Sequence, residues 1–334
     1  MRTLETSNHL IGDQAALEAQ FEKNGYWFFK DVLDIDALKR LRKKYINVLE
    51  NFGLVKYGND TLEYTGRSFD AFPGRFKLKD MDAWKSFANN SKIKNFVEEV
   101  MGEKIIWIPI VEYRAVRPLG RVPADRFQFW HCDGHFNPGI PYRTIWFPLC
   151  DINQEVGGLA LRPGLPRGPK LEPDSPAPKT SPEAITFIPH DHELLCESMV
   201  ATYPYKLGDV IIFDKRTPHS GMHNLSNRFR LSMDIRFVRS SDNVPLIGKL
   251  IALAENSIKV KSHDDGHVET LQIDPDAMFR ENVTRFPVDA FEKSFPVGTD
   301  VIVARQNGIA TLVTHLYPPE KTYDDRGPIK ETFS

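Results

Sequence analysis

The chain has 334 residues, of which 41% are hydrophobic and 26% are charged, so it can bury the core of a large globular domain. Its 43 basic and 45 acidic residues give a net charge of -2, which argues against nucleic acid or an anionic membrane as a partner. Three cysteines, at positions 132, 150 and 196, are too few for a disulfide framework and fit a reducing compartment. The first 14 residues lack the apolar stretch of a signal peptide, and no segment approaches about 18 apolar residues. We therefore expect a cytoplasmic protein without a transmembrane helix.

Helices are predicted at both ends of residues 14–52, where apolar side chains recur at spacings of three and four. Asp34 is placed to cap the second of these helices. Between them, Tyr26-Trp27-Phe28-Phe29 predicts a short strand. A further helix is predicted over residues 82–101.

From Ile105 onward the pattern changes to short apolar runs that are separated by turn residues. Such runs are typical of an antiparallel sandwich or barrel. Residues 163–189 hold eight of the 24 prolines, which excludes a helix or a central strand and predicts a surface loop or a lid beside a pocket. The predicted strands cover residues 105–113, 127–131, 144–149, 158–162, 184–189, 199–204, 209–213 and 230–238.

Almost one hundred residues follow the last of these strands. The apolar run at 245–254 predicts a helix, and Asn307-Gly308 between two apolar runs predicts a β-hairpin. We expect residues 241–334 to be a C-terminal extension that packs on the core, contributes to the pocket or forms the interface of a homo-oligomer.

The residues that carry chemistry begin at His131-Cys132-Asp133. In a strand, residues two apart point to the same face, so His131 and Asp133 can aim at one point while Cys132 faces away. One imidazole and one carboxylate are two ligands of a facial triad. His219, which follows an apolar strand, is the best candidate for the third ligand. Arg230 comes eleven residues later, and its guanidinium fork suits bidentate binding of a carboxylate.

Residues 105–238 resemble the phytanoyl-CoA dioxygenase family of iron(II)/2-oxoglutarate oxygenases. The resemblance implies a double-stranded β-helix (jelly roll) core, wrapped by the N-terminal helices, within residues 1–240. It also implies that Arg230 binds the distal carboxylate of 2-oxoglutarate and that Trp146 and Tyr113 flank this cosubstrate. The motifs that carry it are His131-Cys132-Asp133, Trp146, the run from Gly157-Gly158-Leu159 to Pro163-Gly164, His219 and Arg230.

The activity that the resemblance implies is oxidation of a small-molecule metabolite, most often hydroxylation, with use of O2 and release of succinate and CO2. Related halogenases carry a small residue at the position of Asp133, so the carboxylate disfavours halogenation. Desaturation, epoxidation or ring formation would use the same iron site. Pro163-Gly164-Leu165-Pro166 lacks the serine and histidine that are usual in this family's Pro-Gly-Ser-His segment, which suggests a rebuilt loop.

The residues alone leave other interpretations open. His135 would share the strand face of Asp133, where it is placed to line the substrate site or to replace a ligand, and His223 also lies near the proposed ligands. A cupin-type metal-dependent isomerase or hydrolase would use the same ligand set without Arg230. A non-catalytic binding protein on a jelly-roll fold would need no iron.

Overall fold

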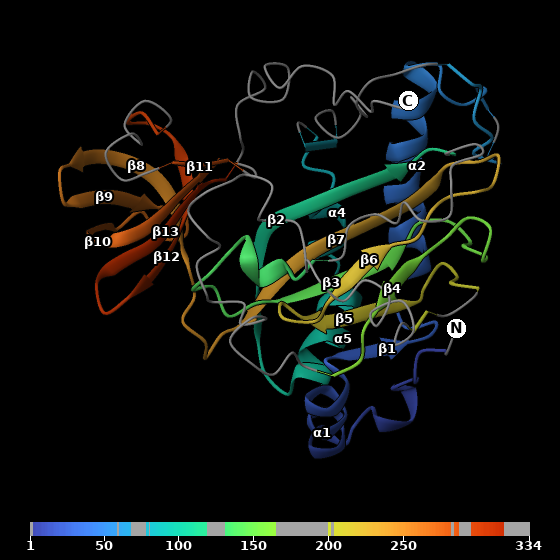
Figure 1. Ribbon diagram of the computed structural model, residues 1–334, viewed down its shortest axis with the longest axis horizontal. Coiled ribbons are helices and arrows are strands. Elements are labelled where there is room, and N and C mark those ends of the chain that lie inside the picture. The colour runs from blue at the N-terminus through green and yellow to red at the C-terminus, as the bar shows by residue number, and fades with distance from the viewer. Residues whose placement is uncertain are drawn as a thin grey trace, which may run out of the picture.

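The computed structural model describes residues 3–58, 60–67, 78–79, 81–118, 131–164, 200–201, 204–281, 284–286 and 295–316. Two β structures follow one another along the chain: a helix-covered sheet that ends at residue 239, and a smaller barrel over residues 246–316 (Figure 1). The predicted strand over 127–131, apart from His131, and the one over 184–189 lie outside the described residues. So does the proline-rich segment 163–189 from residue 165 onward.

The helices begin where the sequence offers a side-chain cap. The side chains of Asp13, Asp34 and Asn90 each accept a hydrogen bond from a backbone N–H in the first turn of the following helix, at 2.9–3.0 Å. The single helix predicted over 82–101 is therefore wrong, because Asn90 starts a new helix after a short one. None of the described helices is long and apolar enough to cross a membrane. The bounds are α1 (Gln14–Asn24), α2 (Ile35–Asn51), α4 (Lys85–Ala88) and α5 (Ser91–Met101), with 3-10 turns η1 (Asn8–Leu10) and η2 (Asp133–His135).

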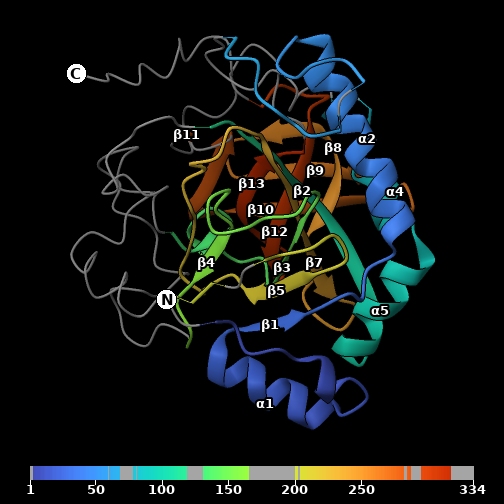
Figure 2. The same ribbon diagram turned by 90° about the vertical axis from the view of Figure 1, so that its right-hand side faces the viewer.

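The main sheet contains five antiparallel strands in the order β1-β5-β3-β7-β2. Helices α2, α4 and α5 cover one face of this sheet, and β4 lies on the other side (Figure 2). Strands β4 and β6 pair as a separate ribbon, and the two layers form the predicted jelly-roll core. The bounds are β1 (Tyr26–Phe29), β2 (Ile105–Val116), β3 (Arg143–Pro148), β4 (Leu159–Leu161), β5 (Val210–Asp214), β6 (His219–Gly221) and β7 (Arg230–Arg239).

Aromatic side chains close the space between the sheet and its helices. Phe87 of α4 stacks on Phe147 of β3, with ring centroids 4.3 Å apart. The Tyr45 hydroxyl of α2 donates to the carbonyl of Ser232 in β7 at 3.0 Å. Because the helices close this face of the sheet, a site for small molecules has to lie on the face toward β4 and β6.

A second sheet, formed by β8 to β13, closes on itself. Its order is β11-β10-β13-β12-β8-β9, and β9 pairs with β10 as well as with β8. Of the pairings in this sheet, the one between β10 and β13 is parallel and the others are antiparallel. This ring of five strands has the connectivity of an OB-type Greek-key barrel. The bounds are β8 (Leu246–Ala254), β9 (Ser257–Ser262), β10 (Val268–Glu281), β11 (Thr284–Phe286), β12 (Asp300–Gln306) and β13 (Ile309–His315).

The helix predicted over 245–254 is wrong, because these residues form strand β8. An apolar run of this length does not by itself distinguish a buried helix from a strand. Leu246, Gly248 and Leu250 are buried and alternate with more exposed neighbours, and β8 pairs on both sides, with β9 and β12. The predicted hairpin is confirmed: Asn307 and Gly308, with φ of 51° and 76°, form the turn between β12 and β13.

The barrel packs against residues 136–142, which we call the seam loop. Ile140 and Tyr142 of this loop share a buried apolar cluster with Ile302 and Leu312 of the barrel. The loop follows directly after His131-Cys132-Asp133, so the barrel contacts the chain immediately beside the proposed metal ligands.

One hydrogen bond and one close approach of the backbone join the seam loop to the barrel. The Nη2 group of Arg280 in β10 donates to Oδ1 of Asn137 at 2.6 Å. Gly139, with φ of +78°, approaches so closely that a Cβ atom there would lie 2.9 Å from Oγ1 of Thr311 and 3.3 Å from Cβ of Ala304. Only glycine meets both requirements without strain.

Candidate metal centre and its pocket

His131, Asp133 and His219 meet at one point, with ligand atoms that all lie within 4.8 Å of one another. Oδ1 of Asp133 is 3.7 Å from Nε2 of His131 and 3.6 Å from Nε2 of His219. The backbones of His131 and His219 form an antiparallel bridge through two hydrogen bonds of 3.1 and 3.0 Å. The structure thus brings the three predicted ligands together.

The local backbone differs from the continuous strand that we expected. His131 lies in an isolated bridge, and Asp133 opens the 3-10 turn η2. Between them Cys132 faces away as predicted, and its buried Sγ donates to the carbonyl of Arg216 at 3.2 Å. Residues 133–135 form a turn, so the alternation of a strand, from which His135 was predicted to share a face with Asp133, does not apply there.

The second carboxylate oxygen of Asp133 is held by the protein. Oδ2 accepts from Oγ1 of Thr144 at 2.7 Å and from Nη2 of Arg236 at 2.9 Å. Burial acts to raise the pKa of this carboxyl, but the charge of Arg236, the two histidines and the Thr144 hydrogen bond together hold it well below its usual range. Asp133 is therefore ionised, with Oδ1 directed toward the two imidazoles.

His219 is held as a neutral imidazole. Its Nδ1 donates to the carbonyl of Thr217 at 3.0 Å, which leaves the lone pair on Nε2 facing Asp133. Burial, together with the neighbouring His131, lowers the pKa of His219 to about 3. A metal ion at this point would not compete with a proton on that nitrogen near neutral pH.

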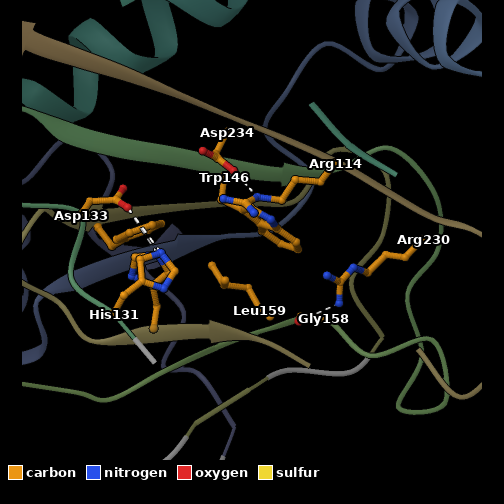
Figure 3. A pocket seen from close by; sticks show the side chains of 11 residues that line it. Arg114, His131, Asp133, Trp146, Gly158, Leu159, Arg230 and Asp234 are labelled. Atoms are coloured by element: carbon orange, nitrogen blue, oxygen red, sulfur yellow. Dashed lines mark hydrogen bonds and ion pairs between the residues drawn. The ribbon is translucent and has the colours of Figure 1, made fainter. Parts of the chain in front are cut away.

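The triad forms one end of a pocket between the main sheet and the β4–β6 ribbon, with about 430 Å³ of space that includes its opening to solvent (Figure 3). Apolar and charged side chains share the walls. The described lining residues are Arg114, His131, Asp133, Trp146, Gly158, Leu159, Phe213, His219, Gly221, Arg230 and Asp234.

Arg230 lies across the pocket from the triad (Figure 3). It is 2% exposed, and its Nη1 group donates to three backbone carbonyls, those of Gly157, Gly158 and Met222, at 2.7–3.2 Å. Gly157 is needed in this loop, because a Cβ atom there would lie 2.1 Å from the carbonyl oxygen of His223. The buried guanidinium is thus fixed in orientation by the backbone before any ligand arrives.

Trp146 and Tyr113 have different positions. Trp146 of β3 lines the pocket, with its ring centroid 5.2 Å from that of Tyr205. Tyr113 is not among the described lining residues; its hydroxyl accepts a hydrogen bond from the backbone N–H of Trp84 on the helix-covered side of β2. Its neighbour Arg114 lines the pocket instead. The structure therefore does not bring Tyr113 to the pocket.

Sequence reasoning missed the charged residues behind the triad. Arg236 donates to Asp133 and to Asp234, and Asp234 in turn accepts from Nε of Arg114 at 2.7 Å. A signal was available in β7, where polar residues alternate with apolar ones. Alternation of this kind in a strand of a central sheet marks a polar face inside the fold. The polar positions are Arg230, Ser232, Asp234 and Arg236.

Comparisons with known proteins agree with this geometry. The family model of phytanoyl-CoA dioxygenase (PhyH) matches residues 21–232. The 1-deoxypentalenic acid 11-beta-hydroxylase of Streptomyces exfoliatus is 23% identical over 240 residues, which is 70% of this chain and 84% of the relative. The enzyme of the same name from Streptomyces arenae is 24% identical over 246 residues, with the same coverage.

Solved structures with a similar fold include two bound to ligands. The epimerase SnoN in complex with Fe3+, alpha ketoglutarate and nogalamycin RO is 20% identical, with a TM-score of 0.43 over 69% of this chain and 86% of that one. EctD from S. alaskensis with 2-oxoglutarate and 5-hydroxyectoine is 18% identical, with a TM-score of 0.43 over 72% and 80%.

The chain belongs to the phytanoyl-CoA dioxygenase family, whose model covers more than half of its residues. It is accordingly a non-haem iron oxygenase that uses 2-oxoglutarate.

Proposed function

We propose that His131, Asp133 and His219 hold the iron(II) and that the pocket beside them is where a small metabolite is hydroxylated. The observation that carries this proposal is the convergence of two imidazole nitrogens and one carboxylate oxygen within 4.8 Å. Two histidines and one carboxylate on one side of a metal form the set that non-haem iron(II) oxygenases use, with open positions left for other ligands. Mg²⁺ and Ca²⁺ prefer sites made of oxygen ligands alone, so a site with two histidines does not suit them.

Arg230 is the proposed partner of the distal carboxylate of 2-oxoglutarate, with Trp146 beside the cosubstrate. Arg230 faces the triad across the pocket, and a guanidinium group pairs well with a carboxylate. Its hydrogen bonds to three backbone carbonyls orient the guanidinium group. Tyr113 is predicted to flank the cosubstrate on its other side, but its hydroxyl accepts from the Trp84 N–H behind β2, so we leave it out of this proposal.

The groups of the chain have separate tasks in this scheme. When bound, the metal would let O2 act as the oxidant, with one oxygen atom used to convert 2-oxoglutarate to succinate and CO2 and the other to hydroxylate the substrate. Asp133 and His219 are held in their ligating forms by Thr144, Arg236 and the Thr217 carbonyl. The apolar side chains of Leu159 and Phe213 exclude water from the cavity.

The substrate is proposed to be a small metabolite with an apolar skeleton. The apolar part of the wall supports this, and so do relatives that are named as hydroxylases of 1-deoxypentalenic acid. We further propose that residues 1–240 are the oxygenase domain and that residues 241–334 are an extension that packs on it. Homo-oligomerisation through that extension and a cytoplasmic location, which the sparse cysteines favour, complete the proposal.

The test is anaerobic addition of iron(II) and 2-oxoglutarate to the purified protein, followed by visible absorption spectroscopy. A metal-to-ligand charge-transfer band is expected in the wild type and not in His131→Ala. Arg230→Gln should retain the band but require roughly tenfold to hundredfold more 2-oxoglutarate, since one charge-assisted pair is lost. An iron-loaded, folded wild-type protein without the band would overturn the proposal.

A further inference from the structure

Arg114 is a cation in the pocket wall that neither the metal site nor the Arg230 site uses. It lies on β2, and its side chain points into the cavity that His131 and Arg230 also line (Figure 3). Its side chain is 35% exposed, whereas that of Arg236, one step further from the cavity, is 6% exposed. Arg114 therefore presents its charge to whatever occupies the pocket.

The protein uses only one corner of this guanidinium group. Nε donates to Oδ2 of Asp234 at 2.7 Å. Within the described part of the chain, no acceptor is bonded to Nη1 or Nη2 of Arg114. Four N–H bonds on the outer edge of the fork thus remain for a ligand.

Asp234 positions Arg114 but does not saturate it. This one carboxylate is shared by two guanidinium groups, because its Oδ1 accepts from Nη1 of Arg236 at 2.5 Å. Glu112 adds a negative charge near Arg114, but it is not among the described residues that line the pocket. Arg236 is held in turn by Asp133 at 2.9 Å, so the three groups form a rigid buried support. The orientation of Arg114 is set before a ligand binds, which lowers the entropy cost of binding.

We propose that the Nη edge of Arg114 binds a carboxylate of the primary substrate, so that the enzyme selects small apolar acids over their neutral analogues. A planar fork with two parallel N–H donors matches a carboxylate in a bidentate manner, and a neutral carbonyl or hydroxyl uses only part of it. This inference rests on the proposed function, which assigns the distal carboxylate of 2-oxoglutarate to Arg230 and leaves its second carboxylate without a partner from the protein. The same chemistry would suit that second cosubstrate carboxylate, so the experiment has to separate the two sources.

The experiment uses the full chain loaded with zinc(II) and 2-oxoglutarate, which binds ligands without turnover. Its probes are alicyclic carboxylates of one to three rings, each paired with its carboxamide, and their dissociation constants are measured by ligand-observed NMR. In parallel, 2-oxoglutarate is titrated with iron(II) under anaerobic conditions through the charge-transfer band. The variants are Arg114→Gln, Arg114→Lys and, as the reciprocal control, Arg230→Gln, each checked by thermal melting.

The wild type is expected to bind at least one carboxylate roughly tenfold to hundredfold more tightly than its amide, because a hydrogen-bonded charge pair is made only with the acid. Arg114→Gln should abolish this preference and leave 2-oxoglutarate affinity unchanged within a factor of about two, while Arg230→Gln should do the reverse. Arg114→Lys keeps a positive charge beside Asp234, so the variant should fold. It loses the planar fork, so it should retain only part of the preference for the carboxylate over the carboxamide.

Two outcomes would overturn the inference while the proposed function stands. One is a wild type that binds acid and amide equally well in every pair. The other is a loss of 2-oxoglutarate affinity in Arg114→Gln as large as in Arg230→Gln, which would assign Arg114 to the cosubstrate. Absence of the charge-transfer band in the wild type is a separate result that contradicts the proposed function itself, and the inference with it.

Discussion

Replacement of Thr144 by valine removes one hydrogen bond to Asp133 and almost nothing else. The Thr144 side chain is fully buried, and valine has nearly the same shape, so the main change is the loss of the hydroxyl. Oδ2 of Asp133 would keep Arg236 at 2.9 Å but lose the hydroxyl at 2.7 Å. A hydrogen bond to a charged acceptor contributes about 1.5–3 kcal/mol. Groups that orient a metal ligand typically change metal affinity by about 10–100-fold.

The expected result for Thr144→Val is an iron(II) dissociation constant that rises by roughly one to two orders of magnitude. It would be measured by anaerobic competition with a chromophoric chelator. Thr144→Ser retains the hydroxyl and should stay close to the wild type in affinity. If the valine variant is folded, by its circular dichroism and melting transition, and still binds iron like the wild type, Thr144 does not orient Asp133 and the reasoning is refuted.

Three further predictions concern stability. Gly139→Ala should lower the free energy of unfolding by more than Gly308→Ala does. Both glycines have φ near +77°, but only at Gly139 would an added Cβ atom have neighbours within 4 Å. Equal losses of stability in urea unfolding would contradict the contact of Gly139 with the barrel. Asn90→Ala should cost about 1 kcal/mol by removing the cap of α5, and Asn90→Asp should restore most of it. In the metal-free protein, His219 has a pKa lowered to about 3 by burial, so its contribution is fully present above the unfolded pKa of about 6.5 and is lost as pH falls toward 3. Stability should then fall by up to about 1.4 kcal/mol per pH unit below pH 6.5, with a shallower slope in His219→Asn; a flat profile from pH 7 to 5 would show that the pKa of His219 in the fold is the same as in the unfolded chain.

The proximity of His131, Asp133 and His219 could be predicted because each ligand belongs to a short motif that can be recognised in the sequence. A histidine and an aspartate two residues apart and a histidine just beyond an apolar strand are local patterns, and the jelly roll brings them together. The details of the backbone were less accessible. Asp133 is the first residue of a 3-10 turn and does not continue a strand. His131 and Asp133 therefore lie together as predicted, but not through the alternation of side chains along a strand.

What sequence reasoning missed depends on partners far along the chain. β8 is a strand because β9 and β12 pair with it, and its own apolar run does not reveal those partners. Tyr113 and Arg114 are adjacent, so a shift of one residue in a strand decides which of them faces the pocket. The register that decides it comes from pairing with β7, more than one hundred residues later.

The contact between the seam loop and the barrel has a consequence for the order in which the protein matures. Asn137 gains its partner only when Arg280 has been synthesised. Ile140 and Tyr142 gain Leu312 later still, so the loop beside Asp133 lacks these neighbours until the barrel strands have left the ribosome. Domains generally fold as they emerge from the N-terminal end. The main sheet can therefore form early, while the segment that adjoins the metal ligands is ordered last. The barrel therefore decides when the loop beside the metal ligands becomes fully packed.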